Sequence, residues 1–325
     1  MVKFLVIRFS SIGDIVLTSP VVRCLKNQVK GAEIHFLTKK QFEPVVRNNP
    51  YIDKVWILDG KLEEVVKEIK EAYPDYIIDL HHNLRTSLVK KRLKLAAFSF
   101  NKLNFEKWLI VNFNINRLPA LHIVDRYLET VKAFDVQNDQ EGLDYFLDPS
   151  DSILPGLIAK DIPQEFHVLV IGAQHFTKKM PPSMLADLCG QIKLPVVIIG
   201  DKTDSAAAKE ILDLAGNLKI IDTTGKLTIN QSAYLVQQSR SVITHDTGMM
   251  HIAAAFKKKI ISIWGNTIPE FGMYPYLPGN DSKIFEVKGL SCRPCSKIGF
   301  KECPKKHFRC MVDQDLESIA AAVNN

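Results

Sequence analysis

Short runs of β-branched and other apolar residues recur along the whole sequence, and each is followed by a stretch with helical periodicity. This alternation is typical of parallel sheets covered by helices, because two parallel strands need a crossover connection between them. It predicts strands at 3–9, 33–38, 54–58 and 76–80 in the first half, and at 167–172, 195–200, 219–222, 241–244, 260–264 and 283–287 in the second. We therefore expect an α/β protein with two doubly wound, Rossmann-like units.

The boundary between the two units is expected near Pro155. The chain of 325 residues is longer than one ordinary core requires and suits two domains of about 150 residues each. Segment 147–166 contains three prolines and a glycine, a density of helix and strand breakers that is typical of a crossing between domains. We expect an N-terminal domain over residues 1–155 and a C-terminal domain over residues 156–325.

Composition narrows the class of protein. A hydrophobic content of 46% and a charged content of 24% are ordinary for a folded globular protein. The net charge of +6 favours an anionic ligand or an anionic membrane surface, and no motif of a nucleic-acid-binding module is present. No segment approaches the roughly 20 apolar residues of a membrane-spanning helix, and residues 1–9 fit a first strand better than a signal peptide. We expect a cytoplasmic protein, at most peripheral on the inner membrane face.

The first predicted strand leads into a polar loop that ends in a carboxylate. The loop consists of Ser10, Ser11, Ile12, Gly13 and Asp14, and helical periodicity begins at Ile15. A glycine lets a backbone approach a ligand closely, and the carboxyl edge of an open α/β sheet is where ligands bind. Asp14 is therefore a candidate functional residue, although capping of the following helix is an equally good interpretation.

A second candidate site follows the strand predicted at 241–244. It contains His245, Asp246, Thr247, Gly248, Met249 and His251, and a helical stretch follows at once. A tight turn into a helix N-terminus presents free backbone N–H groups and the positive end of the helix dipole, which suits a diphosphate without a metal ion. Three titratable side chains on one such turn favour a functional role over core packing.

Three further loops carry candidate residues. Lys178 and Lys179 follow a predicted strand and can neutralise a phosphate, or they are ordinary surface lysines. Asp201 or Asp204 can hold ribose hydroxyls, or cap the next helix.

The third loop lies in the first half of the chain, after the strand predicted at 76–80. It offers His81, Asn83 and Arg85 to carboxylates or phosphates of an acidic acceptor. The alternative is that the histidines are packed polar residues at a strand end. The basic segment 88–111 after it is either part of that acceptor surface or a solvated amphipathic helix.

Four of the six cysteines crowd near the C-terminus, at positions 292, 295, 303 and 310. Cys292, Cys295, Cys303 and Cys310 can close a tetrahedral structural zinc site. Their longer spacings differ from those of common zinc ribbons, and the alternative is a set of reduced thiols that order a loop.

Four of these segments together resemble the signatures of the family 9 glycosyltransferases, the heptosyltransferases that build the inner core of lipopolysaccharide. They are residues 10–18, the string Thr177-Lys178-Lys179-Met180-Pro181, residues 246–255 and the cysteine segment 292–310, in the order and separation of that family. The resemblance implies a GT-B fold, with two Rossmann-like domains facing a central cleft. It also implies an ADP-heptose donor on the C-terminal domain and a lipid-linked, anionic saccharide acceptor on the N-terminal domain. Met180 and Asn230 depart from the family pattern, which usually has tryptophan and often an acidic residue there.

The resemblance also implies roles for individual residues. Asp14 would be the general base, and Lys178 would contact phosphate. The donor-binding set would be Thr177, Lys178, Asp204, Leu227, Asp246, Thr247, Gly248, Met249 and His251. The acceptor-binding set would be Ser10, Ser11, Gly13, His81, Asn83 and Arg85.

The reaction implied by this arrangement is a single displacement at the anomeric carbon. A sugar hydroxyl needs a positioned base at neutral pH, and the departing diphosphate needs N–H donors and a cation. We expect an inverting, metal-independent enzyme that requires no cofactor. The alternatives are a GT-B enzyme that uses another nucleotide sugar, and a catalytically inactive nucleotide-binding homologue.

Overall fold

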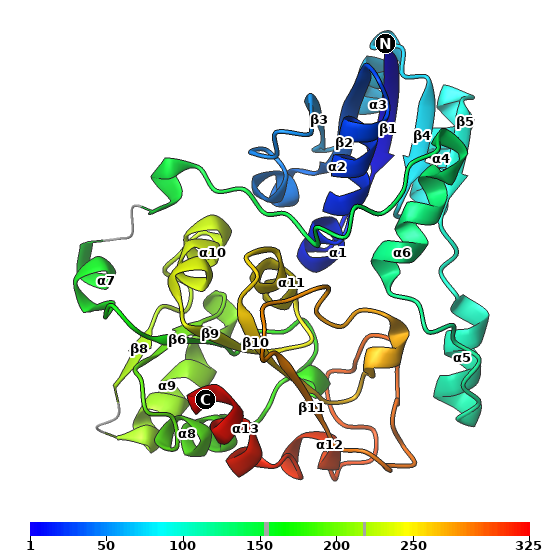
Figure 1. Cartoon of the computed structure of the whole chain (residues 1–325). Helices are drawn as coiled ribbons and strands as arrows, with labels where there is room; N and C mark the ends of the chain where they lie inside the picture. Colours follow the sequence, from blue (N-terminus) through cyan, green and yellow to red (C-terminus); the bar gives the residue numbers. More distant parts are fainter. Residues whose placement is uncertain (153–155, 217–218) are drawn as a thin grey trace. The chain divides into compact units, whose positions relative to one another are not determined.

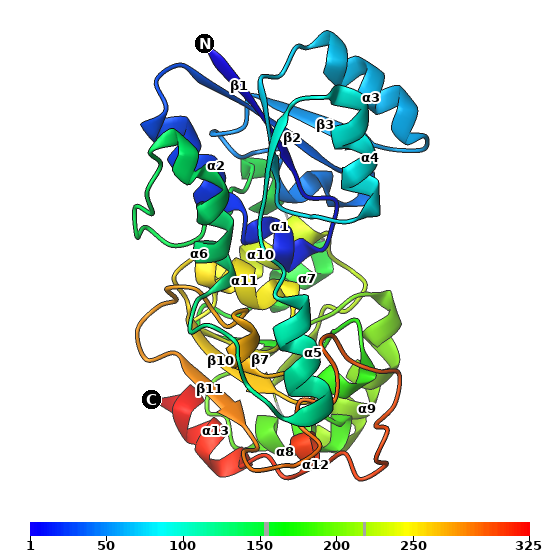
Figure 2. The same ribbon diagram turned by 90° about the vertical axis from the view of Figure 1, so that its right-hand side faces the viewer.

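The computed structural model describes residues 1–152, 156–216 and 219–325 and divides into two compact units (Figures 1 and 2). Unit 1 comprises Met1–Lys102 and Leu121–Phe146, and unit 2 comprises Leu103–Ala120 and Leu147–Asn325. The boundary expected at Pro155 lies outside the described residues. Residues 103–120, expected in the N-terminal domain, belong to unit 2, and so does the chain from Leu147 onward.

Unit 1 is built on a parallel sheet of five strands in the order β3-β2-β1-β4-β5. The strands are β1 (Val2–Ile7), β2 (Ala32–Lys39), β3 (Lys54–Leu58), β4 (Tyr76–Asp79) and β5 (Ala96–Ser99). The helices are α1 (Ile12–Val16), α2 (Ser19–Gln28), α3 (Leu62–Glu71), α4 (Leu84–Leu93) and α6 (Ile123–Leu128), with 3-10 helices at Lys40–Val45 and Glu129–Phe134. β1 pairs with both β2 and β4, so the strand order reverses between β1 and β4.

Unit 2 is built on a parallel sheet of six strands in the order β11-β10-β9-β6-β7-β8. The strands are β6 (His167–Val170), β7 (Val196–Ile199), β8 (Ile220–Asp222), β9 (Ser241–His245), β10 (Lys259–Trp264) and β11 (Lys283–Glu286). The helices are α5 (Asn104–Phe113), α7 (Gly156–Asp161), α8 (Pro182–Gly190), α9 (Ser205–Ala215), α10 (Ile229–Gln238), α11 (Gly248–Ala255), α12 (Arg309–Val312) and α13 (Leu316–Asn324). Short 3-10 helices lie at Pro149–Ser152, Phe176–Lys178, Lys202–Asp204 and Pro269–Phe271. Here the order reverses between β6 and β9.

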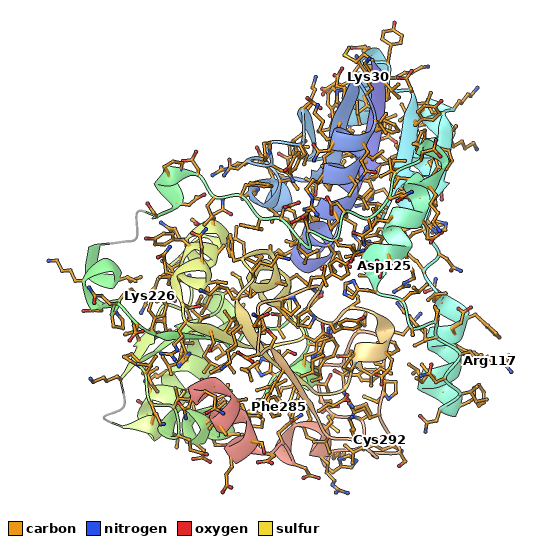
Figure 3. The ribbon with its side chains drawn as sticks, in the orientation of Figure 1. Lys30, Arg117, Asp125, Lys226, Phe285 and Cys292 are labelled. Carbon is orange, nitrogen blue, oxygen red and sulfur yellow. The ribbon has the colours of Figure 1, made fainter. Side chains whose placement is uncertain are left out.

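The structure confirms the ten predicted strands and the α/β class, and it corrects the prediction for segment 88–111. That segment is not one amphipathic helix. α4 ends at Leu93 because Lys94 adopts the left-handed conformation, with φ 57°, and the chain then forms the unpredicted strand β5. Leu103, also left-handed, precedes α5, and Arg117 projects outward beyond that helix (Figure 3).

The chain returns to unit 1 after α5 because aromatic packing holds the segment that follows. Phe134 lies against the sheet, with its ring centroid 4.9 Å from Phe4, 4.9 Å from Tyr76 and 5.1 Å from Phe98. These rings come from β1, β4 and β5, so one side chain ties residues 121–146 to three neighbouring strands. Among the helices of the described residues, none combines the length and the hydropathy needed to cross a bilayer.

Candidate functional site

Each sheet has one point at which its strand order reverses, and most of the predicted site residues follow the strands on either side of it. In unit 1 these strands are β1 and β4, and in unit 2 they are β6 and β9. In open α/β sheets the strands diverge at such a point, and ligands bind outside their carboxyl ends. The fold therefore gives each unit one candidate half-site.

Arg8 organises the half-site of unit 1. It lies directly after β1, is buried, and donates from Nε to the carbonyl of Ser10 at 2.7 Å. It also donates to the carbonyl of Leu80 and to Tyr127 Oη, the latter at 3.0 Å. Its remaining nitrogen forms an ion pair with Asp14 Oδ1 at 2.7 Å. The Arg8 guanidinium thus joins the ends of β1 and β4 to α1 and α6. Sequence analysis missed this role, although an arginine at the end of an apolar strand was the available signal.

Asp14 carries the carboxylate of this half-site. The Ser11 hydroxyl donates to its Oδ2 at 2.7 Å, and the Ser11 backbone N–H donates at 3.2 Å. Burial raises the pKa of Asp14, but the charge of Arg8 and the donors of Ser11 outweigh it, so the pKa is lowered overall. The side chain remains 22% exposed. Asp14 is therefore an ionised, oriented carboxylate that solvent can reach, and it also caps the start of α1.

The turn after β4 is held by a buried carboxylate. Asp79 pairs with Lys90 at 2.8 Å and accepts the backbone N–H groups of residues 81–82 at 3.2 and 2.7 Å. Asn83 is the N-cap of α4, and its Oδ1 accepts the Thr86 N–H at 3.0 Å. The structure thus gives Asn83 a capping role, which leaves its side-chain amide nitrogen for the predicted contact with an acceptor.

His81 and Arg85 gather around one aromatic ring. The His81 ring meets Phe9 edge-on at 5.2 Å, and the Arg85 guanidinium lies 5.9 Å from the centroid of the same ring. Burial lowers the pKa of His81 to about 4, and the positive charges of Arg8 and Lys102 add to the effect. At neutral pH the half-site therefore offers an uncharged imidazole and an exposed arginine.

The half-site of unit 2 begins where β9 passes into α11. Thr247 is the N-cap residue of α11 and makes no side-chain cap hydrogen bond. Its hydroxyl lies 3.2 Å from that of Thr244 instead. Helix α11 then starts at Gly248, which has no side chain to cover the first turn. Backbone N–H groups at an uncapped helix start attract an anion, and the helix dipole adds to the attraction.

Lys178 brings a cation to the same place from the loop after β6. Its Nζ lies 2.5 Å from Asp246 Oδ2, and both side chains are largely buried. The Thr267 hydroxyl donates to the same carboxylate oxygen at 2.9 Å. The structure thus brings together Lys178, Asp246 and Thr247, three of the predicted donor-binding residues, and their contact with a donor stays a prediction. In this arrangement Asp246 holds the lysine beside the start of α11.

The lysine loop, residues 172–181, is fixed by buried polar contacts. Thr177 is buried, and its Oγ1 accepts the Phe300 N–H at 2.9 Å. His245 accepts the Met180 N–H at its Nε2, at 3.0 Å. Burial lowers the pKa of His245 to about 4, with a further contribution from Lys179, so the ring is a neutral acceptor. The Met180 side chain, at the position where the family usually has tryptophan, is buried in the apolar core of unit 2.

Asp204 supports the second lysine of this loop. Its buried carboxylate pairs with Lys179 at 2.6 Å and accepts the Asp201 N–H at 3.0 Å. A Cβ on Gly172 would come within 2.5 Å of Asp204 Oδ2, so glycine is required where β6 ends. Both carboxylate oxygens are thus engaged by protein groups. The ribose contact expected of Asp204 remains a prediction, while its support of the loop is observed.

The other predicted donor residues differ in exposure. Leu227 is partly exposed in the turn before α10, and the Gly225 N–H of that turn donates to the carbonyl of Gly200 at 3.0 Å. Leu227 therefore lies in a turn that is joined to the end of β7, and its contact with the donor stays a prediction. His251 and Met249 are buried in α11, so a direct contact with the donor stays a prediction for both.

Comparison with known proteins identifies the family of the chain. Residues 63–306, more than half of the chain, match the model of glycosyltransferase family 9 (heptosyltransferase). The chain belongs to this family. Lipopolysaccharide heptosyltransferase 1 of Campylobacter coli is 25% identical over 290 residues, which cover 82% of this chain and 84% of that protein.

Solved structures confirm the GT-B class of fold for this glycosyltransferase. A glycosyl transferase family 9 protein of Veillonella parvula superposes with a TM-score of 0.79 at 20% identity, covering 98% of this chain and 95% of that one. The ADP-heptose lps heptosyltransferase II of E. coli superposes with a TM-score of 0.77 at 17% identity, covering 99% and 97%.

Asn266 is a further candidate site residue that sequence analysis missed. It follows β10, the neighbour of β9, and its backbone N–H donates to the Thr177 carbonyl at 3.4 Å. Its side chain is only 1% exposed, yet neither Oδ1 nor Nδ2 has a hydrogen-bond partner among the described residues. An unsatisfied buried amide is costly, so it marks a place for a ligand or a water molecule. Its position directly after a predicted strand was the available signal.

The thiols of the cysteine segment lie near one another in unit 2. Within the described ranges, no group of three or more His, Cys, Asp or Glu side chains is arranged to hold a metal ion. Burial raises the pKa of Cys295 to about 11 and that of Cys310 to about 12, and the neighbouring thiols raise them further. Without a metal ion these two cysteines are therefore protonated at neutral pH, but zinc displaces such protons when it binds, so the raised pKa values fit either interpretation. The structural zinc site and the reduced thiols that order a loop both stay predictions.

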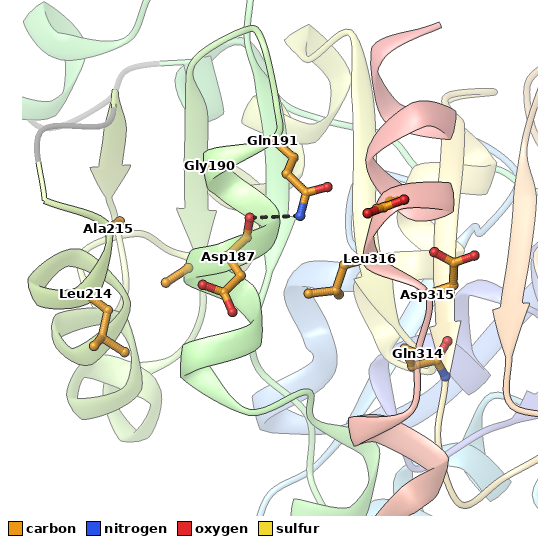
Figure 4. Close-up of a pocket in the computed structure, with 10 residues that line it drawn as sticks. Asp187, Gly190, Gln191, Leu214, Ala215, Gln314, Asp315 and Leu316 are labelled. Carbon is orange, nitrogen blue, oxygen red and sulfur yellow. Dashed lines mark hydrogen bonds between the residues drawn. The ribbon is translucent and has the colours of Figure 1, made fainter.

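A shallow cavity of about 750 Å³ that is open to solvent in unit 2 is separate from the candidate site (Figure 4). It lies between the ends of α8 and α9 and the start of α13, and its lining includes Gln191, Leu214 and Leu316. The ends of α8 and α9 lead into β7 and β8, so the cavity lies at the amino edge of the sheet. None of the predicted site residues lines it.

Proposed function

We propose that this family 9 glycosyltransferase moves heptose from ADP-heptose onto the inner-core region of lipopolysaccharide, at a Kdo or heptose residue. The proposal is based on one observation, namely that a carboxylate lies at the strand-order reversal of one unit and an anion-binding site at that of the other. Unit 1 offers the ionised carboxylate of Asp14, and unit 2 offers Lys178 at the uncapped start of α11. Two relatives support the proposed sugar and nucleotide by their names, lipopolysaccharide heptosyltransferase 1 and ADP-heptose lps heptosyltransferase II.

In the proposed mechanism Asp14 takes the proton of the acceptor hydroxyl. A sugar hydroxyl is too weakly acidic to ionise at neutral pH, so a base must act as the new bond to the anomeric carbon forms. Asp14 has both requirements, an ionised oxygen and a fixed orientation from Arg8 and Ser11. The lowered pKa makes it a weaker base, but it keeps the carboxylate free of a proton in the ground state.

Unit 2 stabilises the leaving ADP. Negative charge grows on the diphosphate as the bond to the sugar breaks, and preorganised donors are most effective where charge develops. The N–H groups at the start of α11 and the ammonium of Lys178 supply this stabilisation, so no metal ion is required. A diphosphate would compete with Asp246 for Lys178. The Asp246 carboxylate would then keep its hydrogen bond from the Thr267 hydroxyl and lose its ion pair with the lysine.

The stereochemistry follows from a single displacement. The acceptor oxygen attacks the anomeric carbon from the face opposite the diphosphate, so the anomeric configuration inverts. Asp14 serves as base rather than as a nucleophile, and no covalent sugar intermediate forms.

The acceptor is proposed to be acidic and lipid-linked. Arg85 and the neutral ring of His81 suit carboxylates and hydroxyls of an acidic core sugar. The acceptor set is completed by three residues of the loop that carries Asp14, namely Ser10, Ser11 and Gly13. A lipid-linked acceptor also requires the enzyme to work in peripheral contact with the cytoplasmic face of the inner membrane.

The deciding experiment is incubation with ADP-heptose and truncated core acceptors in the presence and absence of EDTA. We expect a product heavier by one heptose, inverted at the anomeric carbon, and unaffected by EDTA. A product only with another nucleotide sugar would favour the alternative donor. Stabilisation by nucleotide sugars without any product would favour an inactive homologue.

A further inference from the structure

Helix α5 of unit 2 carries an exposed cluster of aromatic side chains. Phe105 is 61% exposed, Trp108 is 47% exposed and Phe113 is 59% exposed. The Trp108 ring stacks on Phe105 at 6.1 Å and meets Phe113 edge-on at 5.2 Å. Ile115, which follows the helix, is exposed as well. Large apolar side chains grouped at a surface mark an interaction site rather than ordinary solvent exposure.

The opposite side of α5 is anchored, so the aromatic cluster has a fixed support. Ile110 is buried against Ile268 and Phe271 in a small apolar cluster. The Lys107 ammonium lies 5.8 Å from the Phe271 ring, and Asn114 Nδ2 donates to the Ser291 carbonyl at 3.1 Å. The last contact joins the end of α5 to the cysteine segment of the same unit.

The adjoining segment, residues 288–309, is strongly basic. It contains seven lysines and arginines and one glutamate. Arg293 faces inward and donates to the Gly265 carbonyl at 2.6 Å, whereas four lysines are exposed and have no ion pair with any described residue. These four are Lys297, Lys301, Lys305 and Lys306. Ile298 and Phe300 between them are exposed too. In both ribbon views this segment runs beside α5 (Figures 1 and 2).

We propose that α5 and segment 288–309 form one docking surface for an anionic lipid bilayer. Aromatic rings favour the interface between headgroups and acyl chains, and clustered lysines are attracted to anionic headgroups. The surface combines both features on one unit. The inference rests on the proposed function, since a lipid-linked acceptor brings the enzyme to a membrane.

The docking surface is joined to the donor half-site by the backbone. Phe300, within the basic segment, donates its N–H to Thr177, the residue before Lys178. The docking surface and the lysine loop are therefore in direct contact within unit 2.

Trp108 provides a local signal for the test. The chain has three tryptophans, and the other two, Trp56 and Trp264, are buried. We expect vesicles that contain phosphatidylglycerol to shift the tryptophan emission to shorter wavelength and to sediment with the full-length protein. Vesicles of phosphatidylcholine alone should do neither. An unshifted emission, or sedimentation that is equal with both lipids, would overturn the proposal.

Two sets of variants separate the two features of the docking surface. Phe105→Ser with Phe113→Ser should weaken binding to the anionic vesicles at least about tenfold, because apolar contact with the interface is lost. Leu214→Ser, an equally exposed apolar position outside the surface, is the matched control and should bind normally. Thermal melting checks that the variants are folded.

The charge set replaces Lys297, Lys301, Lys305 and Lys306 by glutamine. It should weaken binding at least about tenfold at low salt, since each lysine near an anionic surface contributes. The control replaces the exposed Lys160, Lys193, Lys209 and Lys219 of the same unit, with the same change in net charge. Equal binding by the two quadruple variants would refute a specific surface.

Heptose transfer to a soluble, delipidated acceptor distinguishes this inference from the proposed function. We expect the docking variants to keep that activity and to lose activity only on acceptor embedded in anionic vesicles. If the docking variants keep transfer to both the soluble and the vesicle-embedded acceptor, the docking surface is overturned and the proposed function is unaffected. Absence of transfer by the unaltered protein, with vesicle binding intact, would instead overturn the proposed function.

Discussion

Replacing Asp14 by asparagine tests the chemistry of the unit 1 half-site most directly. The substitution keeps the shape and one oxygen acceptor, so Ser11 can still donate to the side chain. It removes the negative charge that accepts the proton and that pairs with Arg8 at 2.7 Å. We therefore expect two separate effects, one on turnover and one on stability.

The two effects have different expected sizes. Loss of a positioned general base lowers kcat by about 10²- to 10⁴-fold. Breaking a buried ion pair by removing one partner costs about 3–5 kcal/mol, and the partial exposure of Asp14 reduces this to about 2–3 kcal/mol. A loss of that size corresponds to a melting temperature lower by roughly 5–10 °C. The variant therefore stays folded at assay temperatures, and donor binding in unit 2 should be unchanged.

The chain offers a matched control for the loss of stability. Asp139 pairs with Arg23 in the same unit at 2.7 Å, and the two side chains are 24% and 5% exposed, close to the 22% and 9% of the Asp14–Arg8 pair. Arg23 also contacts Asp144, so Asp139→Asn should lower the melting temperature by a similar amount or less. Its kcat should stay within about twofold of the original, because Asp139 accepts no proton in the proposed reaction.

The assay is single-turnover transfer from ADP-heptose at saturating acceptor, with melting curves of the same samples. A kcat of Asp14→Asn above one tenth of the original would remove Asp14 from the chemistry. An equal loss of kcat in Asp139→Asn would show that the effect comes from destabilised structure.

Three further predictions concern other parts of the structure. Arg85→Ala should raise the acceptor KM about tenfold and leave the donor Kd unchanged, and an unchanged KM would contradict its role. Gly172→Ala should lower both the melting temperature and donor affinity because its Cβ would lie 2.5 Å from Asp204 Oδ2, whereas Gly156→Ala, with nothing within 4 Å, should change neither. Because burial lowers the pKa of His245 to about 4, the unfolded state binds more protons between pH 6.5 and 4. The neutral His245 therefore stabilises the folded state above pH 6.5, and at most about 3 kcal/mol of the free energy of unfolding is lost as the pH falls from 6.5 to 4. A melting temperature that does not change between pH 6.5 and 4 would refute this prediction.

The strands were predictable because parallel strands that are covered on both faces are continuous apolar runs. β9 is an example, since all of Ser241–His245 is buried. β5 escaped prediction because Ala96–Ser99 is short, lies at the sheet edge and is largely exposed, so it has no apolar run. The passage of residues 103–120 to unit 2 was equally invisible, since it depends on the contact of Ile110 with residues more than 150 positions away.

The candidate site was predictable where residues follow a strand at the reversal of strand order. Asp14 and the turn at Asp246–Thr247 satisfy this condition, and local sequence is sufficient to place them. The partners that set their chemistry were not predictable. Tyr127 reaches Arg8 from α6, and Thr267 reaches Asp246 from beyond β10, so each needs tertiary packing to be found. Asp204 has a role that its acidic character did not predict, because its carboxylate pairs with Lys179, while the ribose contact stays a prediction.

The two half-sites hold their charged groups in different ways, and the difference fits their tasks. The Arg8 guanidinium makes four contacts with unit 1, so it stays in place when the acceptor, a neutral hydroxyl at the reacting atom, reaches Asp14. Lys178 instead has Asp246 as its partner in both of its contacts, and a diphosphate carries more negative charge than that carboxylate. In the proposed mechanism the donor can therefore capture the lysine, whereas the acceptor leaves Asp14 in its ion pair. Raised salt should accordingly weaken donor binding more than it weakens the binding of the acceptor hydroxyl. Salt screens the attraction between Lys178 and the diphosphate, because both are charged, whereas the hydrogen bond from a neutral hydroxyl to Asp14 is little affected.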